Sequence, residues 1–209
     1  KQALASPREI PQGVIDLIHT IPDEAAPMHV LRTAVSALGC YDAAAETGED
    51  IALARDKSLS LIAQIPVLIA TFHRYRQGKE LLASDSTLGE AANFLWLING
   101  EKPSADMERT IDICYILHAD HGFNASTFSS RVTIATLSDV YSAITSAIGT
   151  LKGPLHGGAN EGVIKMLHAI GDLEKVDAYV EDCLTHKRKI MGIGHRVYTT
   201  LDPRAPHLK

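Results

Sequence analysis

Apolar residues recur at intervals of three and four along nearly the whole chain, the spacing typical of helices that bury one face. Residues 31–38 show this spacing, and Gly39 follows them as a plausible C-terminal stop. A longer run covers residues 51–76, where Pro66 removes one amide donor and should bend the helix. Both segments are therefore predicted to be helices.

Helix-boundary signals follow in the middle of the chain. Thr87 and Glu90 fit a capping box, in which two side chains satisfy amides at the start of a helix, and Gly100 is placed to end that helix. Ser104 opens the next predicted helix, which runs to about residue 118. The spacing of apolar residues within both segments supports a helical interpretation.

The second half of the chain continues the pattern. Residues 126–148 are rich in Ala, Ser and Thr and predict one long helix. Small residues let backbones approach closely, so this helix (to about residue 149) is expected in the interior or at a subunit contact. Residues 159–170 and 176–187 predict two more helices, and no alternating strand or repeat is evident. The predicted fold class is all-α, with helices packed in layers.

Composition limits the possible partners. The chain has 209 residues, of which 45% are hydrophobic, and a formal net charge of −5. This is enough for a packed core in one large domain, or in one domain and part of another. No block of Lys and Arg stands out, which argues against nucleic acid or an anionic membrane as the main partner.

Cysteine use and the N-terminus bear on the compartment. Cys40, Cys114 and Cys183 are odd in number and far apart, as expected for buried thiols in the reducing cytoplasm. No apolar run is long enough to span a membrane. The chain starts with Lys1 rather than Met and lacks the apolar core of a signal peptide. We expect it to begin inside a longer protein or after processing.

Polar residues gather at three helix junctions, at residues 118–124, 153–162 and 191–204. Each junction places a histidine beside glycine, which lets the backbone approach a ligand closely. The same glycines could instead be helix caps. No phosphate-binding glycine loop and no Gly-x-Ser-x-Gly elbow accompany them.

The residue types at these junctions favour acid–base chemistry on a small anion. His156 and His195 can donate or accept protons, and Arg204 can clamp a carboxylate. His118 and His121, three residues apart, offer a metal pair as the alternative, but no third ligand with recognisable spacing accompanies them. We therefore predict no metal site.

Three segments, taken in order along the chain, resemble the histidine motifs of the citrate synthase family. They are His-Ala-Asp-His at 118–121, Gly-Pro-Leu-His-Gly-Gly-Ala-Asn at 153–160, and Gly-Ile-Gly-His-Arg-Val-Tyr at 192–198 with Asp-Pro-Arg at 202–204. The resemblance implies layered helix packing and condensation of acetyl-CoA with oxaloacetate to citrate and CoA, the entry reaction of the tricarboxylic acid cycle. It also implies a homodimer, acetyl-CoA as co-substrate and no tightly bound cofactor.

The resemblance assigns roles by position. His156 matches the residue that hydrogen-bonds the thioester oxygen, and its place at a helix start favours a neutral imidazole donor. His195 matches the residue that donates to the ketone oxygen of oxaloacetate. His121 and Arg204 match oxaloacetate-binding positions, where the guanidinium fork of arginine suits a carboxylate. Asp202 is expected to fix the local turn.

The coenzyme contacts that the resemblance implies lie in the third junction, where a backbone stretch packs around the adenine and basic side chains face the phosphates. The predicted CoA-binding residues are Lys187, Arg188, Ile190, Met191, Gly192, Ile193 and Gly194. Lys189 belongs to the same basic run, whose alternative is a solvated surface.

The family pattern also predicts the domain organisation. Residues 1–158 match most of a large helical domain, incomplete at both ends, and residues 159–209 match the first part of a small CoA-binding domain. The base of the family is an Asp well downstream of the Asp-Pro-Arg segment, as is a further oxaloacetate-binding Arg. Residues 1–209 alone are therefore expected to show little or no turnover.

Three other functions stay open at this point. A 2-methylcitrate synthase uses propionyl-CoA in nearly the same site, and one methylene changes discrimination by only about 1–3 kcal/mol; a citrate-cleaving lyase is a further relative. The alternative of another class is a non-catalytic helical fragment that dimerises or binds a ligand. The helix predicted at 126–149 is a candidate interface, with an intrachain core helix as the alternative.

Overall fold

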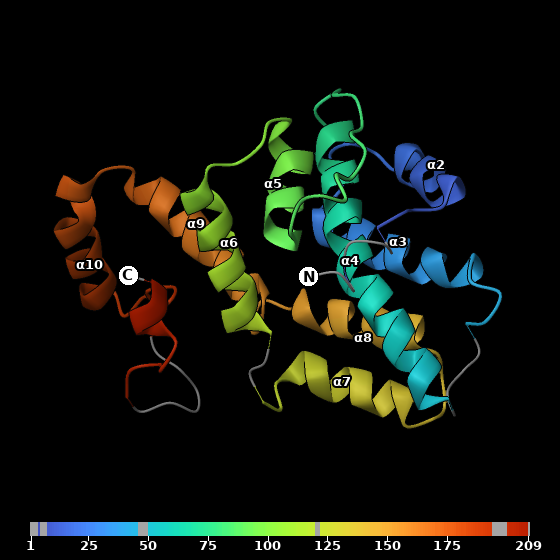
Figure 1. The fold of residues 1–209 in the computed structure, drawn as a ribbon. Coiled ribbons are helices and arrows are strands. Elements are labelled where there is room, and N and C mark those ends of the chain that lie inside the picture. The colour runs from blue at the N-terminus through green and yellow to red at the C-terminus, as the bar shows by residue number, and fades with distance from the viewer. Residues whose placement is uncertain (1–3, 5–7, 46–49, 120–121, 194–199, 209) are drawn as a thin grey trace. The chain divides into compact units, whose positions relative to one another are not determined.

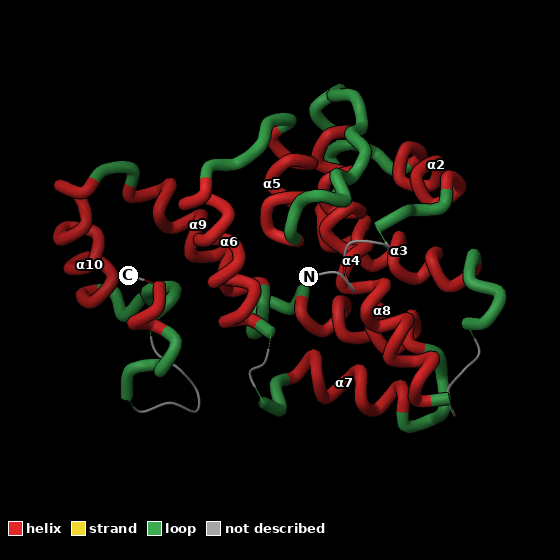
Figure 2. The backbone as a smooth tube through the Cα atoms, viewed as in Figure 1, coloured by secondary structure: helices red, strands yellow, loops and turns green. Residues whose placement is uncertain are grey.

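The computed structural model describes Leu4 and residues 8–45, 50–119, 122–193 and 200–208. Regular secondary structure in these ranges is helical throughout, without strands, which confirms the all-α prediction (Figures 1 and 2). The helices are α2 (Gln12–Thr20), α3 (Pro27–Cys40), α4 (Ile51–Tyr75), α5 (Glu90–Asn99), α6 (Ala105–His118), α7 (Ala125–Ile134), α8 (Val140–Leu151), α9 (Gly158–Ile170) and α10 (Val176–Thr185), with the short 3₁₀ helices η1 (Leu173–Lys175) and η2 (Ala205–Leu208).

The chain divides into two compact units. One contains Lys1–Gly149 and the other Thr150–His207, so the last two residues of α8 already belong to the second unit. Each unit is described below by itself. Their assignment to a large and a small domain, predicted at residues 1–158 and 159–209, stays a prediction. None of the helices in the described ranges is both long and apolar enough to cross a membrane.

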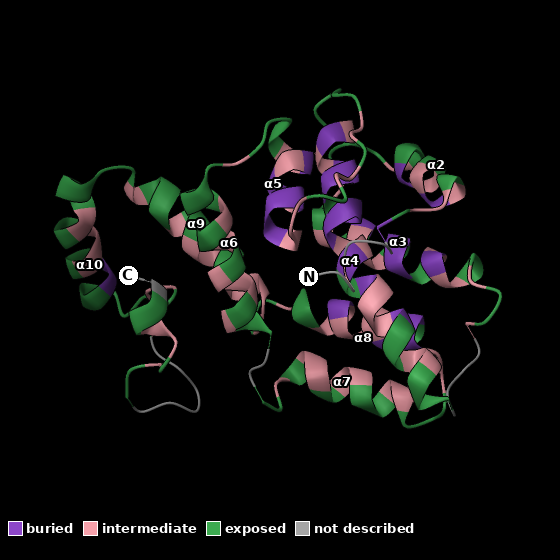
Figure 3. Ribbon diagram, in the orientation of Figure 1, coloured by how far each residue is buried: buried purple, intermediate pink, exposed green. Residues whose placement is uncertain are grey.

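Helix α4 is central to the core of the first unit. It packs against α2, α3 and α5, and α5 in turn packs against α6. Buried residues concentrate on α3, α4, α5 and α8 (Figure 3). The predicted helix over residues 51–76 is confirmed, with Pro66 inside it. The main cluster contains Val14, Ile18, Val30, Ala34, Val35, Leu38, Leu61, Leu68, Phe72, Val140, Tyr141 and Ile148.

Gly39 does not end its helix, so the predicted stop is wrong. Helix α3 continues through Gly39 to Cys40. A Cβ atom on Gly39 would lie 3.2 Å from the Cβ atom of Tyr141. Glycine at this position therefore lets α3 pack closely against α8, which is a tertiary reason rather than a helix-ending one.

The predicted capping box before α5 is also wrong. The Asp85 carboxylate accepts hydrogen bonds from the Thr87 amide at 2.9 Å and the Thr87 hydroxyl at 2.5 Å. Glu90 instead pairs with the guanidinium of Arg8, 3.0 Å away. Gly89 is the N-cap residue and makes no side-chain cap bond. The two side chains of the box thus have other partners.

The ends of α5 and α6 agree with the sequence prediction. Gly100 follows α5 with φ of 85°, a left-handed conformation that favours glycine. Ser104 caps α6, and its side chain accepts a hydrogen bond from the Met107 amide. Both signals act within a few residues of their own helix, so neighbouring elements do not override them.

The long helix predicted at 126–148 is two helices, α7 and α8. Leu137 has φ of 63° in the connection. The Asp139 carboxylate then accepts hydrogen bonds from the amide and hydroxyl of Ser142, at 2.8 and 2.6 Å, and starts α8. Helix α8 buries Val140, Tyr141, Ala143 and Ile148, whereas α7 buries no residue. The core role therefore fits α8 alone.

A buried polar cluster joins α4, α8 and the segment after α3. The Lys57 side chain, of which 8% is exposed, contacts the Asp42 carboxylate, and the Tyr141 hydroxyl donates to the same oxygen at 2.8 Å. Burial would raise the pKa of Asp42, but the hydrogen bonds from Lys57 and Tyr141 outweigh it, and the pKa lies below its usual value. The ionised carboxylate therefore stabilises the folded chain.

We predict that Asp42→Asn lowers the free energy of unfolding by about 3 kcal/mol, because it leaves the Lys57 ammonium buried without its anion. The folded-state pKa of Asp42 lies below the unfolded one. The Asp42 contribution is thus present above about pH 4 and is lost as the pH falls through the folded-state pKa. Urea unfolding at pH 7 and at acid pH measures both effects. Asp23→Asn, at an exposed position, is the control, and equal stabilities of the two variants would contradict the prediction.

Candidate functional site

Part of the predicted site falls within the described residues. His156, Arg204 and the predicted coenzyme residues from Lys187 to Ile193 all belong to the second unit. His121, Gly194 and His195 lie outside the described residues. The roles of all these residues therefore stay predictions, and the structure describes the local geometry around His156 and Arg204.

His156 lies on a tight turn that connects α8 to α9. The His156 amide donates to the Gly153 carbonyl oxygen at 2.9 Å, and the Gly158 amide donates to the same oxygen at 3.1 Å. The His156 carbonyl oxygen accepts from the Ala159 amide at 3.1 Å, in the first turn of α9. The half-buried imidazole is thus attached to a backbone fixed on both sides.

The two glycines after His156 have no room for a side chain. A Cβ atom on Gly157 would lie 2.7 Å from the Leu151 carbonyl oxygen, and one on Gly158 would lie 2.8 Å from the Gly153 carbonyl oxygen. Gly157 has ordinary helical angles, φ −60° and ψ −27°. Glycine is therefore needed at 157 because this residue approaches the end of α8 so closely, and at 158 because the turn folds back on its own carbonyl oxygens, and not because of an unusual backbone conformation at Gly157.

Arg204 is held by the carboxylate of Asp202. One oxygen, Oδ1, accepts from the Arg204 amide at 2.9 Å and from Nε at 3.0 Å, and Oδ2 accepts from Nη2 at 2.7 Å. The side chains of both residues are 29% exposed. The bond to the amide closes the turn before η2, so Asp202 does fix the local turn as predicted.

The basic run lies just beyond the C-terminal end of α10. Lys187, Arg188 and Lys189 are exposed, and Lys187 has φ of 51°. The Arg188 guanidinium contacts the Asp182 carboxylate and lies 5.8 Å from the centre of the Tyr179 ring. The run is thus accessible to an anionic ligand, although Asp182 partly neutralises it.

The loop that follows the basic run packs on α9. A Cβ atom on Gly162 would lie 2.8 Å from Cε of Met191, and one on Gly192 would lie 3.1 Å from Cγ2 of Val163. Gly192 has φ of 84°, a second reason for glycine there. The helix that starts beside His156 therefore also supports the predicted adenine loop. The sequence does not reveal that Gly162 and Val163 support this loop. The one signal in the sequence is Gly162 itself, a glycine inside a helical pattern.

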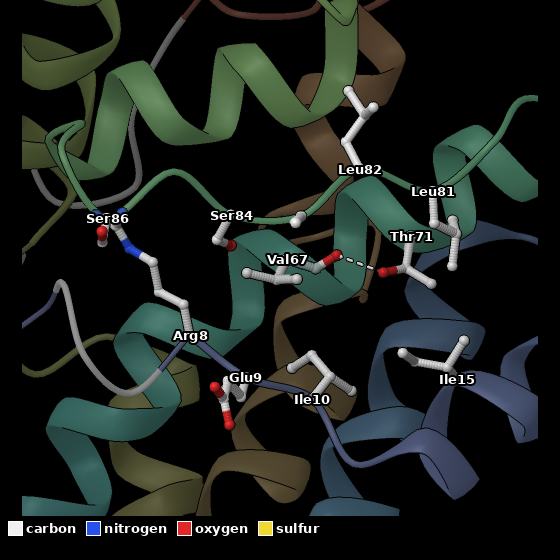
Figure 4. Close-up of a pocket in the computed structure, with 11 residues that line it drawn as sticks. Arg8, Glu9, Ile10, Ile15, Val67, Thr71, Leu81, Leu82, Ser84 and Ser86 are labelled. Atoms are coloured by element: carbon white, nitrogen blue, oxygen red, sulfur yellow. Dashed lines mark hydrogen bonds between the residues drawn. The ribbon is translucent and has the colours of Figure 1, made fainter.

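The first unit contains a pocket of about 680 Å³ between the N-terminal segment, α4 and residues 81–86 (Figure 4). None of the predicted site residues lines it. Arg8, 4% exposed, donates to the carbonyl oxygens of Asp85 and Leu88 at 3.0 and 3.1 Å and pairs with Glu90. These bonds use both terminal nitrogens of the guanidinium, while Nε is buried without a hydrogen-bond partner. The contacts fasten the N-terminal segment, so we assign Arg8 a structural role.

His118 bonds its own helix. Its Nδ1 atom lies 2.7 Å from the Cys114 carbonyl oxygen at the end of α6. His121, its partner in the alternative metal pair, lies outside the described residues. Within the described ranges, no group of three His, Cys, Asp or Glu side chains is close enough to hold a metal ion.

Comparison with known proteins identifies the family. The family model for the citrate synthase C-terminal domain matches residues 1–209. Citrate synthase 2 of Bacillus subtilis is 50% identical over the full length of this chain. The chain belongs to the citrate synthase family. It is also 44% identical, over 97% of its length, to 2-methylcitrate synthase 2 of Corynebacterium glutamicum.

A solved citrate synthase has the same fold. The enzyme from Thermoplasma acidophilum, in a ternary complex with carboxymethyl coenzyme A and oxaloacetate, matches 98% of this chain with a TM-score of 0.88 and 31% identity. The chain spans about half of these family members, covering 56% of the Bacillus protein and 54% of the Thermoplasma chain.

We predict opposite effects of alanine at two glycines. Gly158→Ala should cost about 1–3 kcal/mol of stability, because its Cβ atom would meet two backbone carbonyl oxygens of the His156 turn. Gly149→Ala places a Cβ atom at an ordinary 3.8 Å from Cδ of Arg32, and should stabilise α8 by up to about 1 kcal/mol. Urea unfolding of the two variants measures the difference. Changes of the same sign would show that the turn has room to relax.

Proposed function

We propose that the protein is a citrate synthase that condenses acetyl-CoA with oxaloacetate to give citrate and CoA. The observation that carries the proposal is the His156 turn, which is so tight that neither Gly157 nor Gly158 has room for a side chain. A fixed imidazole at the start of a helix is what stabilisation of a developing negative charge requires. The 50% identity to a curated citrate synthase supports the same reaction.

The proposed first step makes a nucleophile from a weakly acidic methyl group. A carboxylate base removes a methyl proton from acetyl-CoA, and His156 hydrogen-bonds the thioester oxygen as it gains negative charge. A preorganised donor at such an oxygen is typically worth about 10²–10³ in rate. The tight turn supports this role because it holds the donor in place before the charge develops.

The proposed second step forms the carbon–carbon bond. The enolic carbon attacks the ketone carbon of oxaloacetate, while His195 donates a proton to the ketone oxygen. Arg204 and His121 bind the substrate and keep the ketone in line for attack. Water then cleaves the thioester to release citrate and CoA. The guanidinium of Arg204 supports this assignment, since arginine can bind a carboxylate with two parallel hydrogen bonds.

The proposed coenzyme site is formed by Lys187, Arg188 and the loop at residues 190–194. Exposure of the basic side chains supports contact with the CoA phosphates. Packing of Met191 on Gly162 supports a fixed loop that presents backbone groups to the adenine ring. The substrates are the only small molecules that the proposal requires, with no tightly bound cofactor.

A second candidate is a 2-methylcitrate synthase that takes propionyl-CoA. The 44% identity to the Corynebacterium glutamicum enzyme favours keeping it open. The two acyl groups differ by one methylene, so discrimination amounts to about 1–3 kcal/mol. Values of kcat/KM for acetyl-CoA and propionyl-CoA distinguish the two. The citrate synthase assignment requires the ratio to favour acetyl-CoA.

We propose a homodimer that buries the apolar side of α7. Phe128 and Val132 lie one turn apart on α7 and are 56% and 53% exposed, and Phe123 before the helix is 61% exposed. Exposed apolar side chains gathered in one place are typical of protein interfaces. Most cyclic homodimers bury the same patch of both subunits, so α7 would contact its own copy or a neighbouring helix across a two-fold axis.

The free cysteines support a reducing compartment, which we propose is the cytoplasm. The prediction of buried thiols is wrong for Cys40, which is exposed; Cys114 is half-buried, Cys183 is buried, and all three are free thiols. An exposed free thiol is more readily oxidised than a buried one, and the reducing cytoplasm keeps it as a thiol.

We predict that Phe128→Glu combined with Val132→Glu shifts the protein from dimer to monomer, because two charges would be buried in the interface. Sedimentation velocity at micromolar concentration measures the change. Leu173→Glu, at a leucine of the second unit that is 88% exposed, is the control and should leave the dimer intact. A dimer that persists with both α7 substitutions would exclude this face as the interface.

We predict that His156→Ala lowers kcat by about 10²–10³, because the donor to the thioester oxygen is lost. Oxaloacetate binding should change far less, since His156 contacts the other substrate. A thiol-release assay of the complete enzyme that contains residues 1–209 gives kcat, and calorimetric titration with oxaloacetate gives the affinity. His168→Ala, on an exposed position of α9, is the control. Equal losses in kcat and affinity would assign His156 a structural role only.

A further inference from the structure

The carboxylate of Asp202 accepts three hydrogen bonds from Arg204, and only Pro203 separates the two residues. Its two oxygens accept from the amide, Nε and Nη2 of Arg204, at 2.9, 3.0 and 2.7 Å. The Asp202 carbonyl oxygen also accepts from the Ala205 amide at 3.0 Å. The backbone turn and the guanidinium are thus fixed by the same residue.

These contacts do more than close a turn. Closing the turn needs only the bond from the Arg204 amide to Oδ1. The two bonds to Nε and Nη2 instead hold the side chain, which has several rotatable bonds and loses part of that freedom in the pair. The ring of Pro203 restricts the backbone between the two residues further. The arginine is therefore oriented before any ligand arrives.

The edge of the guanidinium that Asp202 occupies determines how a ligand approaches. Arginine has five N–H groups in one plane, and Asp202 takes the Nε edge. The N–H groups on Nη1 and the second one on Nη2 point away from Asp202, along the end of the side chain. A planar carboxylate matches that end-on edge with two parallel hydrogen bonds.

We propose that Asp202 is a positioning residue for oxaloacetate, which holds Arg204 so that its end-on edge meets a substrate carboxylate. The inference rests on the proposed role of Arg204 in oxaloacetate binding. Asp202 itself does not touch the substrate. Its negative charge weakens the attraction of Arg204 for the anionic substrate, so the benefit comes from orientation, which reduces the ordering cost of binding.

Two substitutions distinguish the bond that closes the turn from the bonds that hold the guanidinium. Asp202→Asn keeps an oxygen for the Arg204 amide, but its NH₂ group cannot accept from Nη2. Asp202→Ala removes both functions. Asp172→Asn is the matched control, because the Asp172 carboxylate also accepts from the amide two residues later, that of Glu174, at 3.4 Å, and pairs with no arginine among the described residues.

The experiment measures the affinity and KM for oxaloacetate and the KM for acetyl-CoA separately, in the complete enzyme that contains residues 1–209. We expect Asp202→Asn to weaken oxaloacetate binding in calorimetry, and to raise the KM for oxaloacetate, by about tenfold, the lower end of the loss typical when the partner that orients a metal ligand is removed. The KM for acetyl-CoA should stay within about twofold of the wild type, and the thermal midpoint within about one degree. The Asp172→Asn control should stay within the same limits in all three measurements.

Three results would overturn the proposal. Oxaloacetate affinity of Asp202→Asn equal to the wild type would show that the turn alone matters. Equal losses for both substrates, with a lower thermal midpoint, would indicate a general structural defect. Oxaloacetate binding that is unaffected by Arg204→Ala would show that the proposed site itself is wrong, and this result distinguishes failure of the site from failure of the positioning role.

Discussion

The lack of space for a Cβ atom at Gly157 and Gly158 is the constraint on which the second unit depends. The chain turns so tightly between α8 and α9 that the carbonyl oxygens of Leu151 and Gly153 lie 2.7 and 2.8 Å from the two missing positions. This fixes where α9 starts and where His156 lies. Because Met191 then packs on Gly162 of the same helix, the support of the predicted adenine loop is set by the same turn.

In the first unit, buried ion pairs hold neighbouring segments of the chain together. Lys57 and Asp42 join α4 to the segment after α3, and Arg8 with Glu90 joins the N-terminal segment to α5. Both pairs are supported by further hydrogen bonds, which offset the cost of removing charges from water. The apolar core lies on α2, α3, α4 and α8, whereas α6 and α7 bury no residue (Figure 3). This difference supports a further contact for α7.

Local signals predicted most helices, and tertiary contacts explain the errors. Gly39 reads as a stop in the sequence, but the close approach of Tyr141 is what requires it. Asp139 starts a second helix inside a run rich in Ala, Ser and Thr, where the composition concealed the capping signal. Helix α2 was not predicted, although its buried Val14 and Ile18 have helical spacing. In the site, the motifs marked the segments, but no pattern indicates that Asp202 would bind Nε and Nη2 of the arginine two residues away.

The most direct measurement is a crystal structure of the polypeptide that carries these residues, with oxaloacetate and carboxymethyl-CoA bound. The account predicts a carboxylate of oxaloacetate on the guanidinium of Arg204 and the ketone oxygen beside His195. It also places the His156 imidazole against the carboxymethyl group, which replaces the acetyl group. Ligands bound away from these three side chains, or a His156 ring directed away from the coenzyme, would contradict it.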